Sequence, residues 1–235
     1  MRIGQCLRCR EGRIFMPVVT LVRRKRRIVL IGMMHLASSD FFACVRSRLE
    51  SHERSGFRIL YENIDPHLSL DFDSDEQREM QAKCKEAHHE LVSRLASLGL
   101  DYQGEHIPLR STWVSADFML QDWQCHGLSV FLPTQAMLAG LEQGAKDPEG
   151  VIRAMRLHLT NPSHKVNMPH VIWGRRDRFA AKRILQHVKR GNVATFWGAI
   201  HILGMTKRLI NVGFKVRDIE WIPAVDLNKL KAERG

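Results

Sequence analysis

Three short runs that are apolar through their centres constrain the fold of this chain more than any other feature. They are RIVLIG at 27–32, RILYE at 58–62 and NVATFWG at 192–198, and each is rich in β-branched or aromatic residues. A strand with one exposed face alternates apolar and polar residues, whereas the centres of these runs do not alternate. We therefore expect parallel sheet strands that are covered on both faces.

The segments between these runs have the spacing of amphipathic helices. One is predicted over 38–56, with Ser39 or Asp40 as N-cap, and one over 73–99, ending at Gly99. Further helices are expected at 113–125, 133–144, 148–159 and 176–191, and further strands at 18–22 and 215–222. This alternation predicts an α/β fold with a mainly parallel central sheet flanked by helices.

Length and composition limit the class of protein. A chain of 235 residues with 44% hydrophobic and 26% charged residues fits one globular domain, which we place at 16–235 after a leader, 1–15, that need not be ordered. The five cysteines are dispersed, and Cys6 and Cys9 lack the second pair that a zinc ribbon needs. We therefore expect a cytoplasmic protein.

The formal net charge of +11 would suit an anionic partner. The basic residues are scattered except for RRKRR at 23–27 and WGRRDR at 173–178, so a solvated basic surface is favoured and nucleic-acid binding is disfavoured. Binding to nucleic acid or to an anionic membrane is the alternative. No apolar stretch approaches the ~20 residues of a membrane span, so no transmembrane segment is expected. Nothing in the sequence indicates an oligomeric state.

Reactive side chains follow the three central strands at the point where each strand ends. The first strand leads through Gly32 to His35, the second ends at Glu62, and the third leads through Gly198 to His201. Ligands of open parallel sheets bind just outside the carboxyl ends of the strands. We therefore expect these two imidazoles and this carboxylate to converge in a site.

Two imidazoles and a carboxylate suit a divalent metal such as zinc, manganese or cobalt. A metal of this kind lowers the pKa of bound water toward ~7, which favours hydrolysis at neutral pH. Without a metal, the same side chains are able to act as general base, general acid and orienting carboxylate. The sequence leaves both possibilities open.

Several motifs resemble those of the TraB/PrgY/GumN family, to which the TIKI peptidases are similar. They are GMMH at 32–35, YE at 61–62, FWGAIHILGM at 196–205 and GFKVRDIEWIPAV at 213–225. The resemblance implies a fold like that of the erythromycin esterase and ChaN group. It also implies a site containing His35, Glu62 and His201, and the metal-dependent peptidase activity reported for TIKI members. We place Tyr61, next to Glu62, among the substrate-binding residues.

The family also has an arginine in a short E-R-D or E-R-N motif at the head of a helix. Here Arg176 and Asp177 match the last two positions, while Arg175 replaces the glutamate. We expect Arg176 to bind a substrate carboxylate or to stabilise developing negative charge. Asp117, in SADF at 115–118, resembles a further acidic position of the family.

The leading hypothesis is therefore a metal-dependent hydrolase of peptide, amide or ester bonds. Its metal ligands would be His35, Glu62 and His201, and Arg176 would contact the substrate. The alternative is a binding protein that captures a peptide or a haem-like ligand in the same cleft without turnover. Haem is included because the ChaN proteins bind it.

Overall fold

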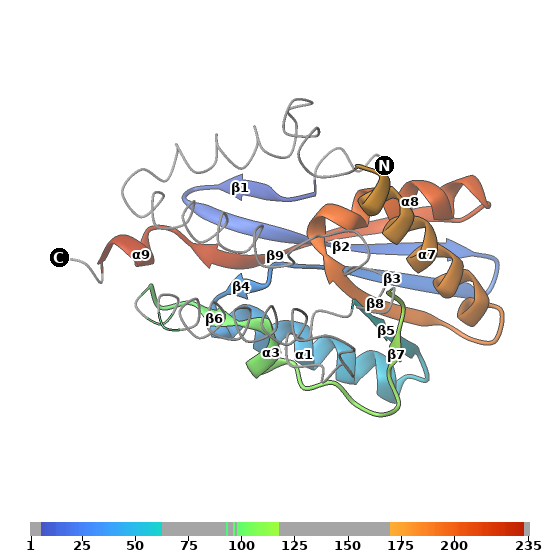
Figure 1. Cartoon of the computed structure of the whole chain (residues 1–235), viewed down its shortest axis with the longest axis horizontal. Helices are drawn as coiled ribbons and strands as arrows, with labels where there is room; N and C mark the ends of the chain where they lie inside the picture. The colour runs from blue at the N-terminus through green and yellow to red at the C-terminus, as the bar shows by residue number, and fades with distance from the viewer. Residues whose placement is uncertain (1–5, 63–92, 94–95, 97, 118–169, 233–235) are drawn as a thin grey trace, which may run out of the picture.

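A computed structural model describes residues 6–62, 93, 96, 98–117 and 170–232 (Figure 1). Its strands are β1 (Arg8–Arg10), β2 (Arg13–Arg23), β3 (Arg26–Met33), β4 (Leu36–Ala37), β5 (Arg58–Tyr61), β6 (Asp101–Tyr102), β7 (Val114–Ser115), β8 (Val193–Gly198) and β9 (Lys215–Asp226). Its helices are α1 (Ser39–Arg54), α3 (Gln103–His106), α7 (His170–Val188), α8 (Ala199–Asn211) and α9 (Lys229–Ala232).

One mixed sheet forms the centre of the described structure. β3 pairs with β8, β8 with β5 and β5 with β7, all in parallel. β2 pairs in antiparallel fashion with β1, β3 and β9. The expected parallel arrangement of the three central strands is confirmed, but antiparallel strands make up the other half of the sheet. A separate two-stranded sheet joins β4 to β6.

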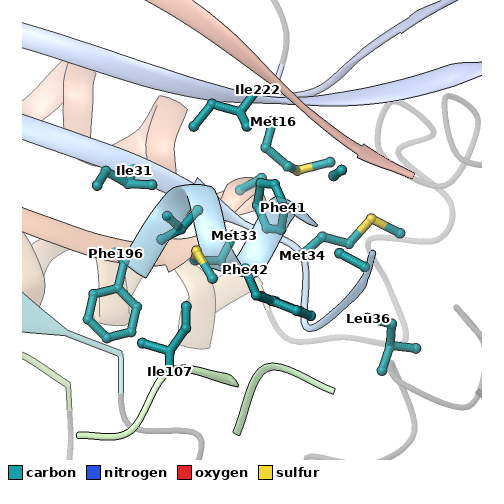
Figure 2. Packing of buried hydrophobic residues seen from close by; sticks show 14 of the residues in the cluster. Met16, Ile31, Met33, Met34, Leu36, Phe41, Phe42, Ile107, Phe196 and Ile222 are labelled. Carbon is teal, nitrogen blue, oxygen red and sulfur yellow. The ribbon is translucent and has the colours of Figure 1, made fainter. Parts of the chain in front are cut away.

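Helices cover both faces of the sheet, as Figure 1 shows, with α1 on one side and α7 and α8 on the other. Alternate residues of β3 supply the two cores: Ile31 packs with α1, whereas Leu30 packs with α7 and α8. On the α1 side, Phe41 and Phe42 pack in one cluster with Met16 of β2 and Met33 of β3 (Figure 2). Burial on both faces explains why the central strands do not alternate.

Each strand predicted from the sequence is present. β2 and β9 are longer than expected, because they pair with each other along nearly their whole length, from Arg13 opposite Asp226 to Val22 opposite Lys215. Residues 8–15, assigned above to the leader, form β1 and the start of β2, with Cys9 opposite Ile14. They pair with the sheet instead of preceding it. Cys6 is a free thiol.

The helix predictions were partly right. α1 is present, but its N-cap is Ser38, whose hydroxyl accepts a hydrogen bond from the Phe41 N–H. The predicted helix 176–191 begins earlier, as α7. The helix predicted at 113–125 is wrong over its described part, because Val114 and Ser115 pair with β5 as the edge strand β7. The rest of that helix, the helices at 133–144 and 148–159, and most of the helix at 73–99 lie outside the described residues.

The glycine that ends the first apolar run is required by close packing. Gly32 lies in β3, and a Cβ added there would come within 2.8 Å of Pro17 Cδ on β2. Gly32 is therefore needed for the close approach of β3 to β2. In the described part of the chain, no helix has both the length and the apolar character that a bilayer crossing requires.

Candidate functional site

The parallel strands β3, β8, β5 and β7 all end at one edge of the sheet, and a polar residue follows each of them. His35 follows β3, Glu62 follows β5 and Asp117 follows β7. β8 leads through Gly198 directly into α8, whose first turn carries His201. The edge predicted from the sequence is therefore the place where these residues gather, and β7 adds a fourth strand end.

Arg176 on α7 links three members of this group, Glu62, Asp117 and His201. Its Nε donates to Asp117 Oδ1 at 3.1 Å, and its Nη2 donates to both Glu62 Oε1 and Asp117 Oδ2. Its Nη1 lies 3.0 Å from His201 Nε2. The guanidinium also lies 5.3 Å from the centroid of the Trp197 ring. Arg176 is buried, so these contacts replace its hydration.

His201 is held by both of its ring nitrogens. Its Nδ1 lies 2.7 Å from Asp177 Oδ1, and its Nε2 faces the Arg176 guanidinium. A guanidinium has only donors, so Nε2 accepts and Nδ1 carries the proton that is donated to Asp177. The imidazole is buried, and Trp197 packs edge-on against it. Tautomer and ring orientation are thus both fixed.

Glu62 is an ionised carboxylate inside the protein. Burial alone would raise its pKa, but the Arg176 guanidinium, with smaller effects from His201, His35 and the Gly198 N–H, lowers it to about 2. The Gly198 N–H donates to Glu62 Oε2 at 2.5 Å. Burial likewise works against the charge of Arg176, but Glu62 and Asp117 raise its pKa above the usual range. These opposite charges stabilise each other.

His35 is half-buried, whereas Glu62, Arg176 and His201 are buried, so its imidazole lies at the boundary of the buried group. Its Nδ1 lies 3.0 Å from Gln103 Oε1, and its backbone carbonyl accepts from the Gln103 N–H at 2.9 Å. An amide oxygen only accepts, so His35 Nδ1 donates and Nε2 carries the lone pair. Nε2 would lie 3.7 Å from a Cβ on Gly198, and Glu62 Oε2 would lie 3.2 Å from the same point.

Two predicted substrate-binding residues have other contacts. Tyr61 stacks on Phe196, with ring centroids 6.1 Å apart, and packs against the core on the α1 side. Arg176 already pairs with two carboxylates of the protein, so a substrate carboxylate would have to displace one of them. Arg176 therefore holds the carboxylates of Glu62 and Asp117 together. Arg175 beside it is exposed.

The described arrangement does not fit a metal on His35, Glu62 and His201. Arg176 donates hydrogen bonds to His201 Nε2 and to one oxygen of Glu62, and the Gly198 N–H donates to the other oxygen. Among the described residues, no group of three histidine, cysteine or carboxylate side chains has the geometry to hold an ion. A metal on this set of residues would require Arg176 to move away, so we derive no chemical step through one.

Sequence reasoning missed Gln103, and it noted Asp117 and Asp177 only through the resemblance. Gln103 begins α3, directly after β6 pairs with β4. Its contact with His35 joins residues 68 positions apart, and no local pattern marks it. No strand was predicted before Asp117, because 113–125 was expected to be a helix; Asp117 follows the short strand β7 much as Glu62 follows β5.

Comparison of the chain with protein-family models, with curated proteins and with solved structures gave no match in any of the three. The resemblance to the TraB/PrgY/GumN family is therefore carried by the motifs alone and stays a prediction.

Proposed function

We propose that this protein hydrolyses an amide or ester bond, of which a peptide bond is the leading example, at the carboxyl ends of the parallel strands. One observation carries the proposal. The half-exposed His35 places the lone pair of Nε2 on the same side of Gly198 as the ionised carboxylate of Glu62: each would lie within 4 Å of a Cβ on Gly198, and His35 helps to lower the Glu62 pKa. This is the arrangement of a general base beside a fixed negative charge.

In the proposed reaction, His35 Nε2 accepts a proton from water as the water oxygen attacks the carbonyl carbon. The imidazolium that forms is stabilised by Glu62, which is ionised at neutral pH. The imidazolium then donates the proton to the leaving nitrogen or oxygen as the bond to the carbonyl carbon breaks. Gln103 keeps His35 Nε2 free for this task, while Arg176 fixes the position of Glu62.

The motifs at 32–35, 61–62 and 196–205 support the proposal through their resemblance to the TraB/PrgY/GumN family. The proposal includes a fold of the erythromycin esterase and ChaN type. The divalent metal implied by the same resemblance stays a prediction. Calorimetric titration of Mn²⁺, Co²⁺ and Zn²⁺ into the wild-type protein and into His201→Ala tests that prediction. Equal binding by the two proteins would exclude His201 as a ligand.

A screen of fluorogenic peptides, amides and esters tests the hydrolytic activity, with wild-type protein, His35→Ala and His187→Gln compared at equal concentrations. His187 is a half-buried histidine near the end of α7, remote from the strand ends, and serves as the matched control. We expect turnover by the wild type and His187→Gln and a loss of 10²-fold or more in His35→Ala. Equal turnover by all three proteins would contradict the role of His35.

The second candidate is ligand capture without turnover. The partial exposure of His35 at the strand ends, where His201 is buried, favours it. Titration with haem, followed by absorbance, distinguishes the two functions. A Soret shift that disappears in His35→Ala, together with no turnover of any substrate, would favour the binding protein.

A further inference from the structure

Basic residues gather at the edge of the sheet opposite the candidate site. The β2–β3 turn brings Arg23 to Arg27 to this edge, where Arg26 Nη2 donates to the Lys189 carbonyl at the end of α7. Asn192 ties the start of β3 to the start of β5: its side-chain oxygen accepts from the Arg27 N–H and its carbonyl accepts from the Arg58 N–H. We define the basic edge as Arg23, Arg24, Lys25, Arg26, Arg27, Arg58, Lys189, Arg190 and Lys215, all of them exposed.

Carboxylates of the described residues do not neutralise the charge of the basic edge. Among the described residues, none of its nine members forms an ion pair. The nearby Glu50 and Glu53 of α1 pair with Arg110 instead. The carbonyl end of α7 offsets part of the charge, since the Lys189 carbonyl accepts from Arg26, but this is a partial charge against nine cations.

The positive charge near this edge lowers the pKa of two half-buried histidines. Burial lowers the pKa of His187 on α7, and Arg183, Arg58 and Arg190 lower it further. Burial also lowers the pKa of His52 on α1, with added effects from Arg48 and Arg27. Arg27, Arg58 and Arg190 of the basic edge therefore lower the pKa of histidines on two helices, α1 and α7.

Exposed apolar side chains border the basic edge. Ile210 and Val212, at the end of α8, are 44% and 40% exposed, and they are two of the four exposed large hydrophobic residues in the described part of the chain. Gly213, which directly follows Val212, lies beside the β2–β3 turn: a Cβ there would lie 3.4 Å from Arg23 Nε. The Arg23 guanidinium lies 6.0 Å from the centroid of the Phe214 ring.

We infer that the basic edge, with Ile210 and Val212, docks on an anionic membrane surface. Cationic side chains beside exposed aliphatic ones match lipid headgroups above acyl chains. Nucleic acid is the less favoured polyanion, because the edge is formed by turns and helix ends and presents no exposed aromatic ring for base stacking among its described residues. Docking here would leave the opposite edge, with the candidate site, facing away from the membrane.

Co-sedimentation of the full chain with vesicles of 70% phosphatidylcholine and 30% phosphatidylserine tests the inference, with pure phosphatidylcholine vesicles as reference. We expect binding to the anionic vesicles that weakens as salt is raised. The variant Arg23→Gln/Arg24→Asn/Lys25→Gln should bind on the order of 100-fold more weakly, at about fivefold for each charge. Asparagine is chosen at 24 because that residue has φ +54°. Ile210→Ser/Val212→Ser should bind about tenfold more weakly.

The matched control is Arg10→Gln/Arg178→Gln/Lys182→Gln, which removes three exposed charges outside the basic edge. It should bind like the wild type. Equal losses in the control and in the turn variant would show an effect of net charge alone and overturn the inference. Tighter binding to a random-sequence DNA duplex than to the anionic vesicles would overturn it in favour of nucleic acid. Neither readout depends on turnover, so the result is independent of the proposed hydrolysis.

Discussion

Asp177 Oδ2 occupies the space that a side chain on Gly204 would need: a Cβ added at 204 would lie 1.8 Å from that oxygen. This contact explains the second glycine of the GAIHILG segment at 198–204. The glycine lets α8 approach α7 closely enough for Asp177 to reach His201 Nδ1, at 2.7 Å. The spacing between His201 and Gly204 thus follows from the close packing of α8 against α7.

Gly204→Ala should therefore destabilise the protein. The added methyl group displaces Asp177, and we expect the free energy of unfolding, measured by urea denaturation, to fall by about 1–3 kcal/mol. Gly191→Ala is the control, because a Cβ there would meet nothing within 4 Å. A loss at 204 no greater than that at 191 would contradict the contact.

Arg176→Met should cost more stability than any exposed substitution in the described chain. It leaves the carboxylates of Glu62 and Asp117 buried without a counter-charge, and we expect a loss of about 3–5 kcal/mol in the free energy of unfolding. Arg175→Met, at the exposed neighbour, should change stability by about 0.5 kcal/mol or less. Because Arg176→Met/Glu62→Gln removes one of the two stranded charges, it should be more stable than Arg176→Met; the opposite order would argue against the pairing.

The strand ends of the site were predictable because the signal for each is local. An apolar run that ends in a reactive side chain marks His35, Glu62 and the segment leading to His201, and burial on both faces of β3 and β8 makes the run continuous. The edge strand β7 was taken for a helix. It is only two residues long, and its pairing with β5 joins segments more than 50 residues apart.

The partners within the site were not predictable. Arg176 was expected to face the substrate, yet its contacts depend on how α7 packs beside the strand ends, which no spacing in the sequence records. The same holds for Gln103, whose position follows from the pairing of Leu36 with Tyr102. Local patterns located the edge of the sheet, whereas tertiary packing determined which charges meet there.

Acidification should remove the stability that ionised Glu62 contributes. Its pKa is lowered from 4.5 to about 2 in the folded protein, so the contribution is present above the unfolded pKa and is lost as the pH falls through the folded one. Over that window the loss is about 3 kcal/mol, at about 1.4 kcal/mol per pKa unit.

Urea denaturation at pH 7, 4 and 2 measures this loss. Glu62→Gln should be less stable than the wild type at pH 7 but should lose less stability on acidification. The exposed Glu105→Gln serves as control and should follow the wild type. If Glu62→Gln and the wild type lose stability in parallel, the titrating group is not Glu62.

Gln103→Leu should change the tautomer of His35 without unfolding the protein. The leucine has a similar size but no acceptor for the Nδ1 proton, so the ring should shift toward the Nε2–H tautomer that free imidazole side chains prefer. The ¹⁵N shifts of the ring, measured by NMR, report which nitrogen carries the proton. Gln186→Leu, an exposed glutamine on α7, is the matched control and should leave those shifts unchanged. An Nδ1–H tautomer that persists in Gln103→Leu would show that another group holds His35 in place and would remove Gln103 from the mechanism.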